Sequence, residues 1–171
     1  MNTEILRDRL PKKIGRTLIV GSHVYRGRTD RRMAYKDVIG VDMIDGEGVD
    51  YVIDLESDYL PPIGLFDHIE CCSVLEHSRR PWLICANLER LLVLGGTIFV
   101  AAPFVHRLHA YPHDYFRFTV LGIKALFSKI EWTFDAITSI DCLDKRKCPI
   151  IKKDGHPYLA RSESICFGHK I

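Results

Sequence analysis

The chain has 171 residues, of which 47% are hydrophobic and 27% charged, and its net charge is +2. Frequent aromatic and β-branched residues with so small a net charge exclude an intrinsically disordered chain. No apolar run approaches the roughly 20 residues that a membrane-spanning helix needs, so we expect no association with a membrane. We expect a single domain over residues 1–171, since a chain of this length can enclose one hydrophobic core.

The cysteines and the N-terminal residues indicate the cellular compartment in which the protein resides. Two of the six cysteines, Cys71 and Cys72, are adjacent, which differs from the spaced frameworks of secreted disulfide-rich proteins. Adjacent residues of a strand point to opposite faces, so these two cysteines are expected to be buried thiols rather than joint metal ligands. Residues 1–13 carry scattered charges and no apolar core, unlike a signal peptide. We therefore expect reduced thiols and a cytoplasmic protein.

Charge is strongly ordered along the chain. Residues 1–36 hold ten Lys and Arg against three Asp and Glu, and residues 37–78 hold eleven Asp and Glu and no Lys or Arg. Residues 79–171 hold fourteen basic and eight acidic residues. Two interpretations remain open. The blocks lie on different faces and neutralise one another, or several acids converge at one edge toward a polar or cationic ligand.

Short apolar runs alternate with helical patterns. Pro81 suits the first turn of a helix with an apolar stripe, and Gly95 with Gly96 is expected to end that helix. The run at 97–102 is fully apolar and therefore predicts a central strand. Strands alternating with helices predict an α/β fold with a mostly parallel sheet. The predicted strands are 17–20, 38–41, 49–53, 66–72, 97–102, 132–140 and 164–169, and the predicted helices are 28–36, 81–93 and 119–129.

Ligands bind such sheets at the carboxyl ends of the strands. The residues that directly follow the apolar runs are Gly21, Asp42, Asp54, Ser73 and Pro103. Asp42 follows Gly21 by 21 residues, close to the spacing that places a carboxylate on the ribose hydroxyls of a bound nucleotide. The alternative for Asp42 is a helix cap or turn residue, and Asp54 is an ordinary residue with which to leave a strand.

Several segments together resemble one enzyme family. They are Phe66 to His77 (FDHIECCSVLEH), Pro81 with Trp82, a helix followed by Leu94-Gly95-Gly96, Val41-Asp42-Met43, Asp54-Leu55, Pro103-Phe104, and Tyr111 to Thr119 (YPHDYFRFT). In this combination the chain resembles the class I S-adenosylmethionine-dependent methyltransferases, especially their group of small methyltransferase domains. The resemblance covers residues 17–139 and implies a three-layer Rossmann-like sandwich with a mostly parallel sheet of about seven strands.

The resemblance also implies S-adenosylmethionine as cofactor and assigns residues to it. The backbone around Gly21 and Ser22 would lie against the methionine part, and Asp42 would bind the ribose hydroxyls. Asp54 and Leu55 would lie beside the adenine. The remaining cofactor-binding positions are Met43, which follows the ribose-binding acid, and Ser73, which follows the fourth strand.

The segment at residues 18–28, which contains the end of the first predicted strand and the turn after it, departs from the family pattern. Ile19 stands where the family has an acidic residue, and His23 and Tyr25 stand where it has glycines. A non-catalytic binding or partner-activating module on the same fold is therefore an alternative to a methyltransferase. An NAD-dependent oxidoreductase is a third hypothesis, disfavoured because the chain lacks a G-x-G-x-x-G turn.

The loop at 103–118 is the expected acceptor side. His113 or His77 is the candidate general base, and Tyr115 the candidate for positioning the acceptor. Asp114, Arg117 and His109 are candidate substrate-binding residues. The alternative is that Asp114 and Arg117 pair with each other and merely order the loop.

The sequence indicates no metal site and no nucleic-acid partner. His106, His109 and His113 have ligand-like spacing, but Pro103 and Pro112 disfavour a continuous helix there. The basic residues at 145–153 lack interleaved aromatics, and Glu76 is typical of a helix terminus. We expect a small-molecule or glycan-type acceptor. An open acceptor site is expected, and a homodimer is compatible with it.

Overall fold

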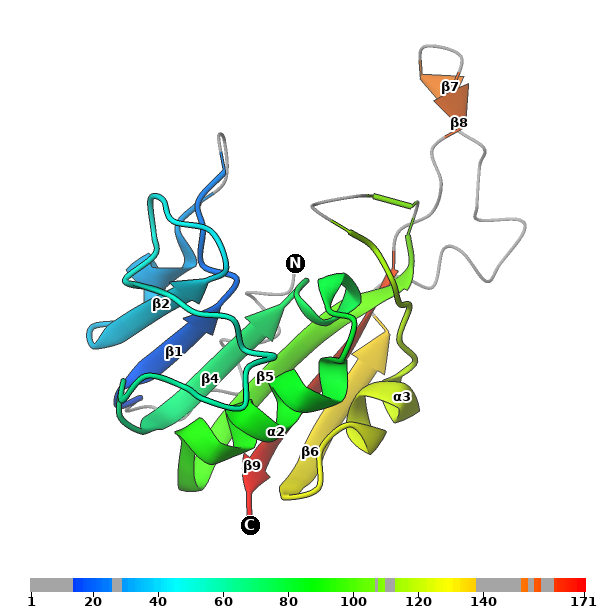
Figure 1. The fold of residues 1–171 in the computed structure, drawn as a ribbon. Helices are drawn as coiled ribbons and strands as arrows, with labels where there is room; N and C mark the ends of the chain where they lie inside the picture. The colour runs from blue at the N-terminus through cyan, green and yellow to red at the C-terminus, as the bar shows by residue number, and fades with distance from the viewer. Residues whose placement is uncertain are drawn as a thin grey trace.

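A computed structural model describes residues 14–25, 29–106, 108–109, 113–137, 152–153, 156–157 and 162–171. The secondary structure forms one large sheet with helices packed against it (Figure 1). Among the described residues, no helix combines the length and the apolar character needed to cross a membrane.

The large sheet has seven strands in the order β3-β2-β1-β4-β5-β9-β6. β1, β2, β3, β4 and β5 pair in parallel, whereas β9 is antiparallel to both β5 and β6. The predicted mostly parallel sheet is therefore confirmed. The strands are β1 Thr17–Val20, β2 Val38–Asp42, β3 Tyr51–Val52, β4 Phe66–Cys72, β5 Leu92–Val105, β6 Ile130–Ile137 and β9 Ser162–Lys170. A separate antiparallel ribbon joins β7 Lys152–Lys153 and β8 His156–Pro157.

Burial along the strands explains their order. Every residue of β1 is buried, as expected for a strand with neighbours on both sides and covered faces. β5 lies between β4 and β9, so the prediction that 97–102 forms a central strand is confirmed. β3, at the edge, has two exposed residues.

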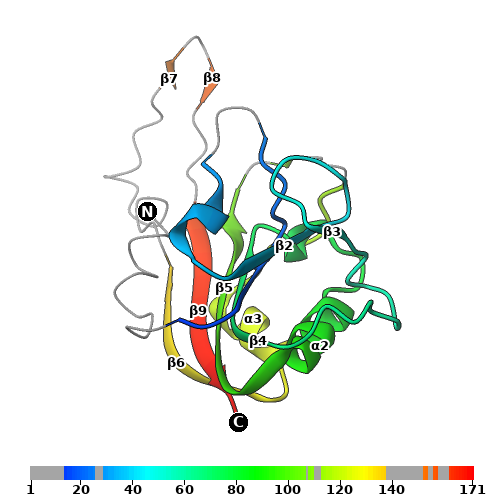
Figure 2. The same ribbon diagram turned by 90° about the vertical axis from the view of Figure 1, so that its left-hand side faces the viewer.

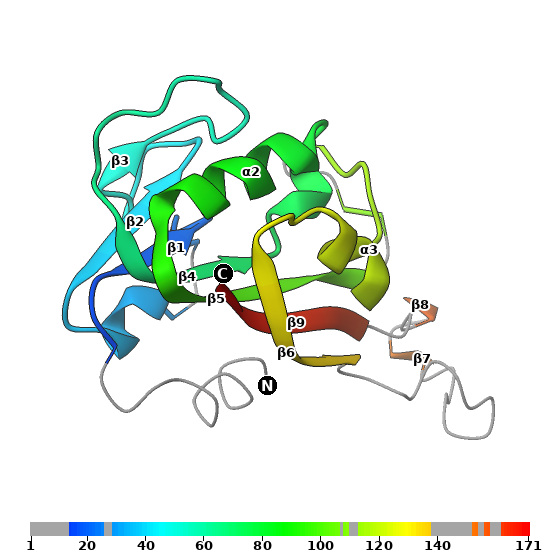
Figure 3. The same ribbon diagram turned by 90° about the horizontal axis from the view of Figure 1, so that it is seen from below.

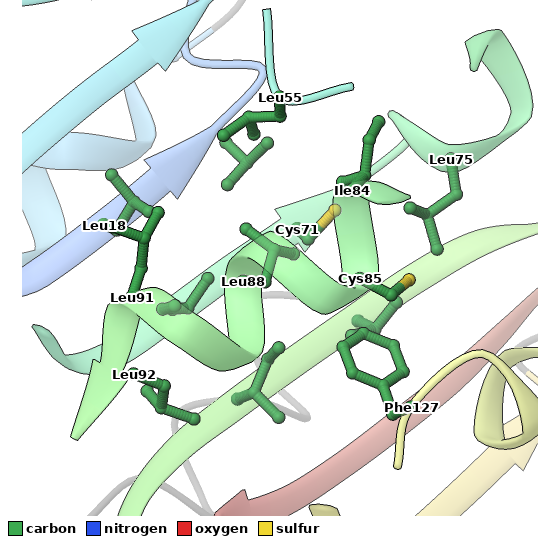
Figure 4. Close-up of a cluster of buried hydrophobic side chains, with 14 of the residues drawn as sticks. Leu18, Leu55, Cys71, Leu75, Ile84, Cys85, Leu88, Leu91, Leu92 and Phe127 are labelled. Atoms are coloured by element: carbon green, nitrogen blue, oxygen red, sulfur yellow. The ribbon is translucent and has the colours of Figure 1, made fainter. Parts of the chain in front are cut away.

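The two α-helices among the described residues lie on the same side of the sheet (Figures 2 and 3). They are α2 Pro81–Leu91 and α3 Val120–Ala125. Thr119 caps the start of α3, because its side chain accepts a hydrogen bond from the Gly122 amide. Beneath α2, aliphatic side chains of the helix meet those of β1, β4 and β5 (Figure 4). The labelled members of this core are Leu18, Leu55, Cys71, Leu75, Ile84, Cys85, Leu88, Leu91, Leu92 and Phe127.

The other face of the sheet carries a 3-10 helix, η1 Arg31–Ala34 (Figure 3). Arg31 and Tyr35 both contact the buried carboxylate of Glu70. Cys72 packs with the cluster on this face, whereas Cys71 belongs to the core under α2. The expectation that the two cysteines point to opposite faces and are free thiols is confirmed.

Several predicted boundaries were wrong. The helix at 81–93 ends at Leu91 and the next strand begins at once, so Gly95 and Gly96 lie inside β5 rather than ending the helix. The short helix at 28–36 is the 3-10 helix η1, and the strand at 49–53 is reduced to Tyr51–Val52. The helix at 119–129 is shorter, and the strand at 132–140 begins at Ile130. Residues 138–140 and most of the basic stretch 145–153 lie outside the described residues.

His68 on β4 makes the stability of the fold dependent on pH. Its side chain is fully buried, and this burial lowers the pKa of the imidazole from 6.5 to about 4, a shift that a hydrogen bond with the Thr97 backbone only partly offsets. The imidazole Nδ1 also lies 2.8 Å from Thr97 Oγ1. The unfolded chain therefore binds this proton first as the pH falls. The free energy of unfolding should therefore be unaffected by this group above pH 6.5. Between pH 6.5 and pH 4, protonation of His68 in the unfolded chain should lower the free energy of unfolding by about 3 kcal/mol.

This prediction is checked by urea unfolding of the wild type and His68→Asn across that range. We expect the free energy of unfolding to fall less steeply with acidification in the variant. The same slope in both proteins would contradict the assignment to His68.

Candidate functional site

The predicted cofactor-side residues follow strands whose carboxyl ends lie at one edge of the sheet. Gly21 and Ser22 follow β1, Asp42 ends β2, and Ser73 follows β4. Because β1 pairs in parallel with β2 on one side and β4 on the other, these ends lie at the same level. The strand order reverses between β1 and β4, and ligands of open α/β sheets bind outside the carboxyl edge at such a point.

The turn after β1 requires glycine. Gly21 has φ +65°, and a Cβ there would lie 2.6 Å from Cγ2 of Val74. The Arg31 guanidinium donates to the carbonyls of Val20 and Gly21 at 2.9 and 2.8 Å, so a side chain from η1 holds this turn.

The segment after the turn shows how the chain accommodates its unusual first motif. His23 turns toward the loop after β2, where its Nε2 would lie 2.3 Å from a Cβ on Gly46. A Cβ on Gly48 would lie 2.6 Å from the Ser22 carbonyl oxygen. The Val24 amide hydrogen-bonds to the same loop. Close backbone approach is therefore provided by glycines on the facing loop, and not by glycines within the segment itself.

Asp42 has a half-buried carboxylate at the end of β2. Its Oδ2 accepts from the His23 amide at 3.1 Å, and its Oδ1 accepts from the Ile44 amide at 3.2 Å. A carboxylate offers about four acceptor positions, so two such bonds leave capacity for two hydroxyl donors. The next side chain, Met43, is 65% exposed at the same edge.

The two residues predicted to lie beside the adenine, Asp54 and Leu55, differ in their burial in the loop after β3. Asp54 is exposed and its Oδ1 accepts from the Glu56 amide at 2.8 Å. Leu55 is buried and its side chain packs in the core under α2, so only its backbone can face a ligand. The Asn87 side chain on α2 donates to the carbonyls of Leu55 and Ser57, each at 2.9 Å, and thereby fixes the loop.

Glu56 connects this loop to the segment before α2. It accepts from Ser78 Oγ at 2.7 Å, from the Arg79 amide at 3.0 Å and from Arg80 Nε at 3.0 Å. Burial alone would raise the pKa of this carboxyl, but the Ser78 and Arg80 hydrogen bonds outweigh it and lower the pKa. Sequence analysis missed both Glu56 and Asn87, because neither stands at a strand end.

Ser73 has a strained backbone at the end of β4. Its φ is +56°, in the left-handed region, although it is not glycine, and its amide donates to the Ala101 carbonyl at 2.9 Å. Such strain costs on the order of 1 kcal/mol and is concentrated at functional sites. The Ser73 side chain is exposed at the carboxyl edge.

The predicted acceptor-side residues come together around Glu76, a residue that the sequence did not place at the site. They come from η2 Leu75–His77, which follows β4, and from the loop after β5. We call this group the histidine cluster; it comprises Glu76, His77, His109, His113, Asp114 and Tyr115.

Backbone contacts hold the two halves of the histidine cluster together. The Tyr115 amide donates to the Glu76 carbonyl at 2.7 Å, and His77 Nδ1 contacts the His113 carbonyl oxygen. The His113 ring lies 5.5 Å from the Tyr115 ring. Arg79 Nε donates to the Tyr115 hydroxyl oxygen at 2.8 Å, so that hydroxyl still has its own proton to donate.

Asp114 and Arg117 form an ion pair inside the loop. Asp114 accepts from Arg117 Nη2 at 2.7 Å and from the His109 amide at 2.7 Å, and its Oδ2 lies 3.1 Å from His109 Nδ1. The Arg117 guanidinium holds the pKa of Asp114 well below its usual range. These contacts support the alternative interpretation, in which the Asp114–Arg117 pair orders the loop.

Glu76 lies at the centre of the histidine cluster. Its side chain is 1% exposed, and burial, with smaller contributions from Asp114 and Glu163, raises the pKa of its carboxyl to about 7. Sequence analysis treated Glu76 as a helix-terminus residue. The only available signal was its position between Leu75 and His77 directly after a buried strand, and that pattern does not reveal burial.

A separate hollow of about 240 Å³ lies at the opposite edge of the sheet. It is lined by residues near the amino ends of β4 and β5, among them Gly15, Asp67 and Thr97. None of the predicted cofactor-binding or acceptor-side residues lines this hollow. All of them follow strands at the carboxyl edge of the sheet.

Comparison with known proteins identifies the fold. No family model and no curated protein matches the chain, but solved structures do. A candidate methyltransferase of Bacillus halodurans C-125 has a TM-score of 0.69 and 14% identity, over 99% of this chain and 97% of that protein. The N-methyltransferase NodS of Bradyrhizobium japonicum WM9, crystallised with S-adenosyl-L-homocysteine, has a TM-score of 0.64 and 12% identity, over 99% and 85% of the two chains.

A third structure is the N-terminal domain of EvdMO1, solved in the presence of S-adenosylhomocysteine and D-fucose. It has a TM-score of 0.60 and 14% identity, over 98% of this chain and 81% of that one. Together with the sheet order, these likenesses show that the chain has the Rossmann-like fold of the class I S-adenosylmethionine-dependent methyltransferases.

Asn87→Leu should loosen the loop after β3. The substitution leaves the carbonyls of Leu55 and Ser57 without their side-chain donor, and each unsatisfied buried group costs about 1–3 kcal/mol. We expect a lower free energy of unfolding, measured by urea denaturation. Arg90→Ala is the matched control, since Arg90 is exposed and the substitution removes only its contact to Asn87 Oδ1, which should change stability by less than about 0.5 kcal/mol. Equal stability of Asn87→Leu and wild type would contradict this role.

Proposed function

We propose that the protein is an S-adenosylmethionine-dependent methyltransferase. The observation that carries the proposal is the position of Asp42. Its half-buried carboxylate ends β2, beside the switch point of a class I methyltransferase sheet, and retains acceptor capacity for a pair of vicinal hydroxyls. Solved structures with the same fold bind S-adenosylhomocysteine, the product of the cofactor.

The cofactor would lie along the carboxyl edge. Its methionine part would run past the backbone of Gly21 and Ser22, where the turn approaches closely because glycine has no side chain. The ribose would bind Asp42 next to Met43. The adenine would lie beside Asp54 and the backbone of Leu55, with Ser73 on the side of β4.

When bound, S-adenosylmethionine supplies a methyl group activated by its positive sulfonium. The protein must then hold an acceptor atom about 3 Å from that carbon with its lone pair aligned. His77 and His113 remain the candidate bases for an acceptor that must lose a proton. Tyr115 can position the acceptor through its free hydroxyl proton, because Arg79 occupies only the oxygen.

We propose a small-molecule or glycan-type acceptor. One neighbour in fold was solved with D-fucose present, and a polar cluster of imidazole, phenol and carboxylate groups suits hydroxyl-bearing ligands. Asp114 and Arg117 would contribute by ordering the loop as a paired unit. The described cysteines are free thiols, which supports a cytoplasmic location, and a homodimer that covers the acceptor side is compatible with the arrangement.

Two alternatives make different predictions. A non-catalytic module would bind the sulfur ligands but transfer no methyl group from labelled cofactor to a panel of sugars and phenols. An NAD-dependent oxidoreductase would bind NAD instead. The antiparallel β9 beside β5 argues against the oxidoreductase, because the dinucleotide-binding sheet continues with parallel strands at that side.

The test is isothermal titration calorimetry with S-adenosylmethionine, S-adenosylhomocysteine and NAD. We expect binding of both sulfur ligands and none of NAD. Asp42→Asn should weaken the binding of S-adenosylhomocysteine about 5- to 150-fold, since the lost charge-assisted hydrogen bonds are worth about 1–3 kcal/mol.

Asp45→Asn is the matched control, because Asp45 is an exposed acid on the loop that follows Asp42. Its affinity should equal that of the wild type. The ribose assignment is wrong if Asp42→Asn also leaves the affinity unchanged.

A further inference from the structure

Three potential metal ligands converge within the histidine cluster. Glu76 Oε1 lies 3.7 Å from His77 Nε2 and 4.0 Å from His109 Nε2. One ligand atom from each of the three residues lies within 4.8 Å of the others. The ring centroids of the two histidines are 4.9 Å apart. Sequence analysis could not find this set, because His109 is separated from His77 by the whole of α2 and β5.

The surroundings of His77 orient its lone pair. His77 Nδ1 contacts the His113 carbonyl oxygen, which favours the tautomer with the proton on Nδ1 and leaves a lone pair on Nε2. The His109 amide donates to Asp114 Oδ2 at 2.7 Å, and this hydrogen bond holds the backbone of His109 beside Glu76. An oxygen partner on the other ring nitrogen, as His77 has, is also the usual arrangement for metal-binding histidines.

The carboxylate between them lacks a counterpart. Glu76 is 1% exposed, and its Oε2 is buried with no hydrogen-bond partner among the residues that the structure describes. The nearby cation, Arg117, forms its ion pair with Asp114. The other oxygen, Oε1, lies 3.7 and 4.0 Å from the Nε2 atoms of His77 and His109, and a cation placed among the three groups would neutralise the buried carboxylate.

We propose that Glu76, His77 and His109 bind a divalent transition-metal ion. Two imidazole nitrogens and one carboxylate oxygen suit zinc, cobalt or manganese rather than magnesium or calcium. Metal–ligand bonds of about 2.0–2.2 Å need ligand atoms roughly 3.0–3.5 Å apart, so separations of 3.7 to 4.8 Å must close by up to roughly 1.8 Å when the ion binds. Asp114 would hold His109 in place, because its Oδ2 accepts a hydrogen bond from the His109 amide at 2.7 Å.

Three protein ligands leave at least one coordination position for solvent, as in open metal sites. With the metal bound, His77 Nε2 is a ligand, and the role of base in the proposed methyl transfer falls to His113. The metal proposal does not depend on that transfer, because it requires only that the ion binds to the protein alone.

The probe is Co²⁺, titrated into EDTA-treated full-length protein and followed by visible absorption. We expect one tightly bound equivalent with d–d bands and without the near-ultraviolet charge-transfer band of cobalt–thiolate bonds. The spectrum separates this site from adventitious binding by cysteines. A thiolate band, or no saturable binding, would overturn the proposal and leave the cluster to share a proton.

Glu76→Gln and His109→Asn should each weaken Co²⁺ binding by more than about 100-fold, since even second-shell changes cost 10- to 100-fold. The matched control is His106→Asn, whose ring centroid lies 4.6 Å from that of His109 but which is not in the ligand set. It should bind Co²⁺ like the wild type. Unchanged affinity in Glu76→Gln, or a loss only in His106→Asn, would overturn the ligand assignment.

Thermal melting provides a second readout that a folding defect cannot imitate. Without metal, Glu76→Gln should melt at the same temperature as the wild type or higher, because it removes an unpartnered buried carboxylate. Saturating Zn²⁺ should raise the melting temperature of the wild type and leave that of the variant unchanged. An equal rise in both would contradict the proposal.

Discussion

The parallel register of β1 with its two neighbours is the constraint on which the site depends. Val20 pairs with Val41 on β2 and with Cys71 on β4, so three strands end within a residue of one another. Gly21, Asp42 and the residues after β4 are therefore brought to one edge by backbone hydrogen bonds. A shift of one residue in these pairings would turn Leu18 and Val20 away from the core under α2, because successive side chains of a strand point to opposite faces.

Polar side chains then fix the loops that follow the strands at this edge. Asn87 ties down the loop after β3, Glu56 joins that loop to the start of α2, and Asp114 orders the loop after β5. In each case a side chain satisfies several donors or acceptors at once, which limits the cost of ordering a loop. Glu76 is different, since its carboxylate is as deeply buried as the core but lacks an equivalent set of partners.

The ordered charge blocks of the sequence serve both purposes considered above, since some acids pair with basic residues of the flanking blocks and others gather at one edge of the sheet. Basic residues of the flanking blocks pair with acids of the middle block, as Arg31 does with Glu70, Arg32 with Asp50 and Arg80 with Glu56. Other acids of the same block gather at the carboxyl edge. These are Asp42, Asp54 and Glu76.

The sequence was sufficient for the class of fold and for the strand-end residues, because apolar runs and the residues after them are local patterns. It was misleading at Gly95 and Gly96, where glycines typical of a helix end lie within a long strand. It could not predict that the histidine cluster would form, because the contact of His109 with Glu76 depends on how the loop after β5 packs against η2. Nor could it show that Gly46 and Gly48 leave room for the His23 side chain and the Ser22 backbone, which lie against them.

The most direct test of the proposed cofactor site is a crystal structure of the protein with S-adenosylhomocysteine. The ribose hydroxyls should lie on the Asp42 carboxylate, the amino-acid part beside the turn at Gly21, and the adenine next to Asp54. A ligand bound instead in the hollow lined by Asp67 and Thr97, or an Asp42 carboxylate without contact to the ribose, would contradict the account.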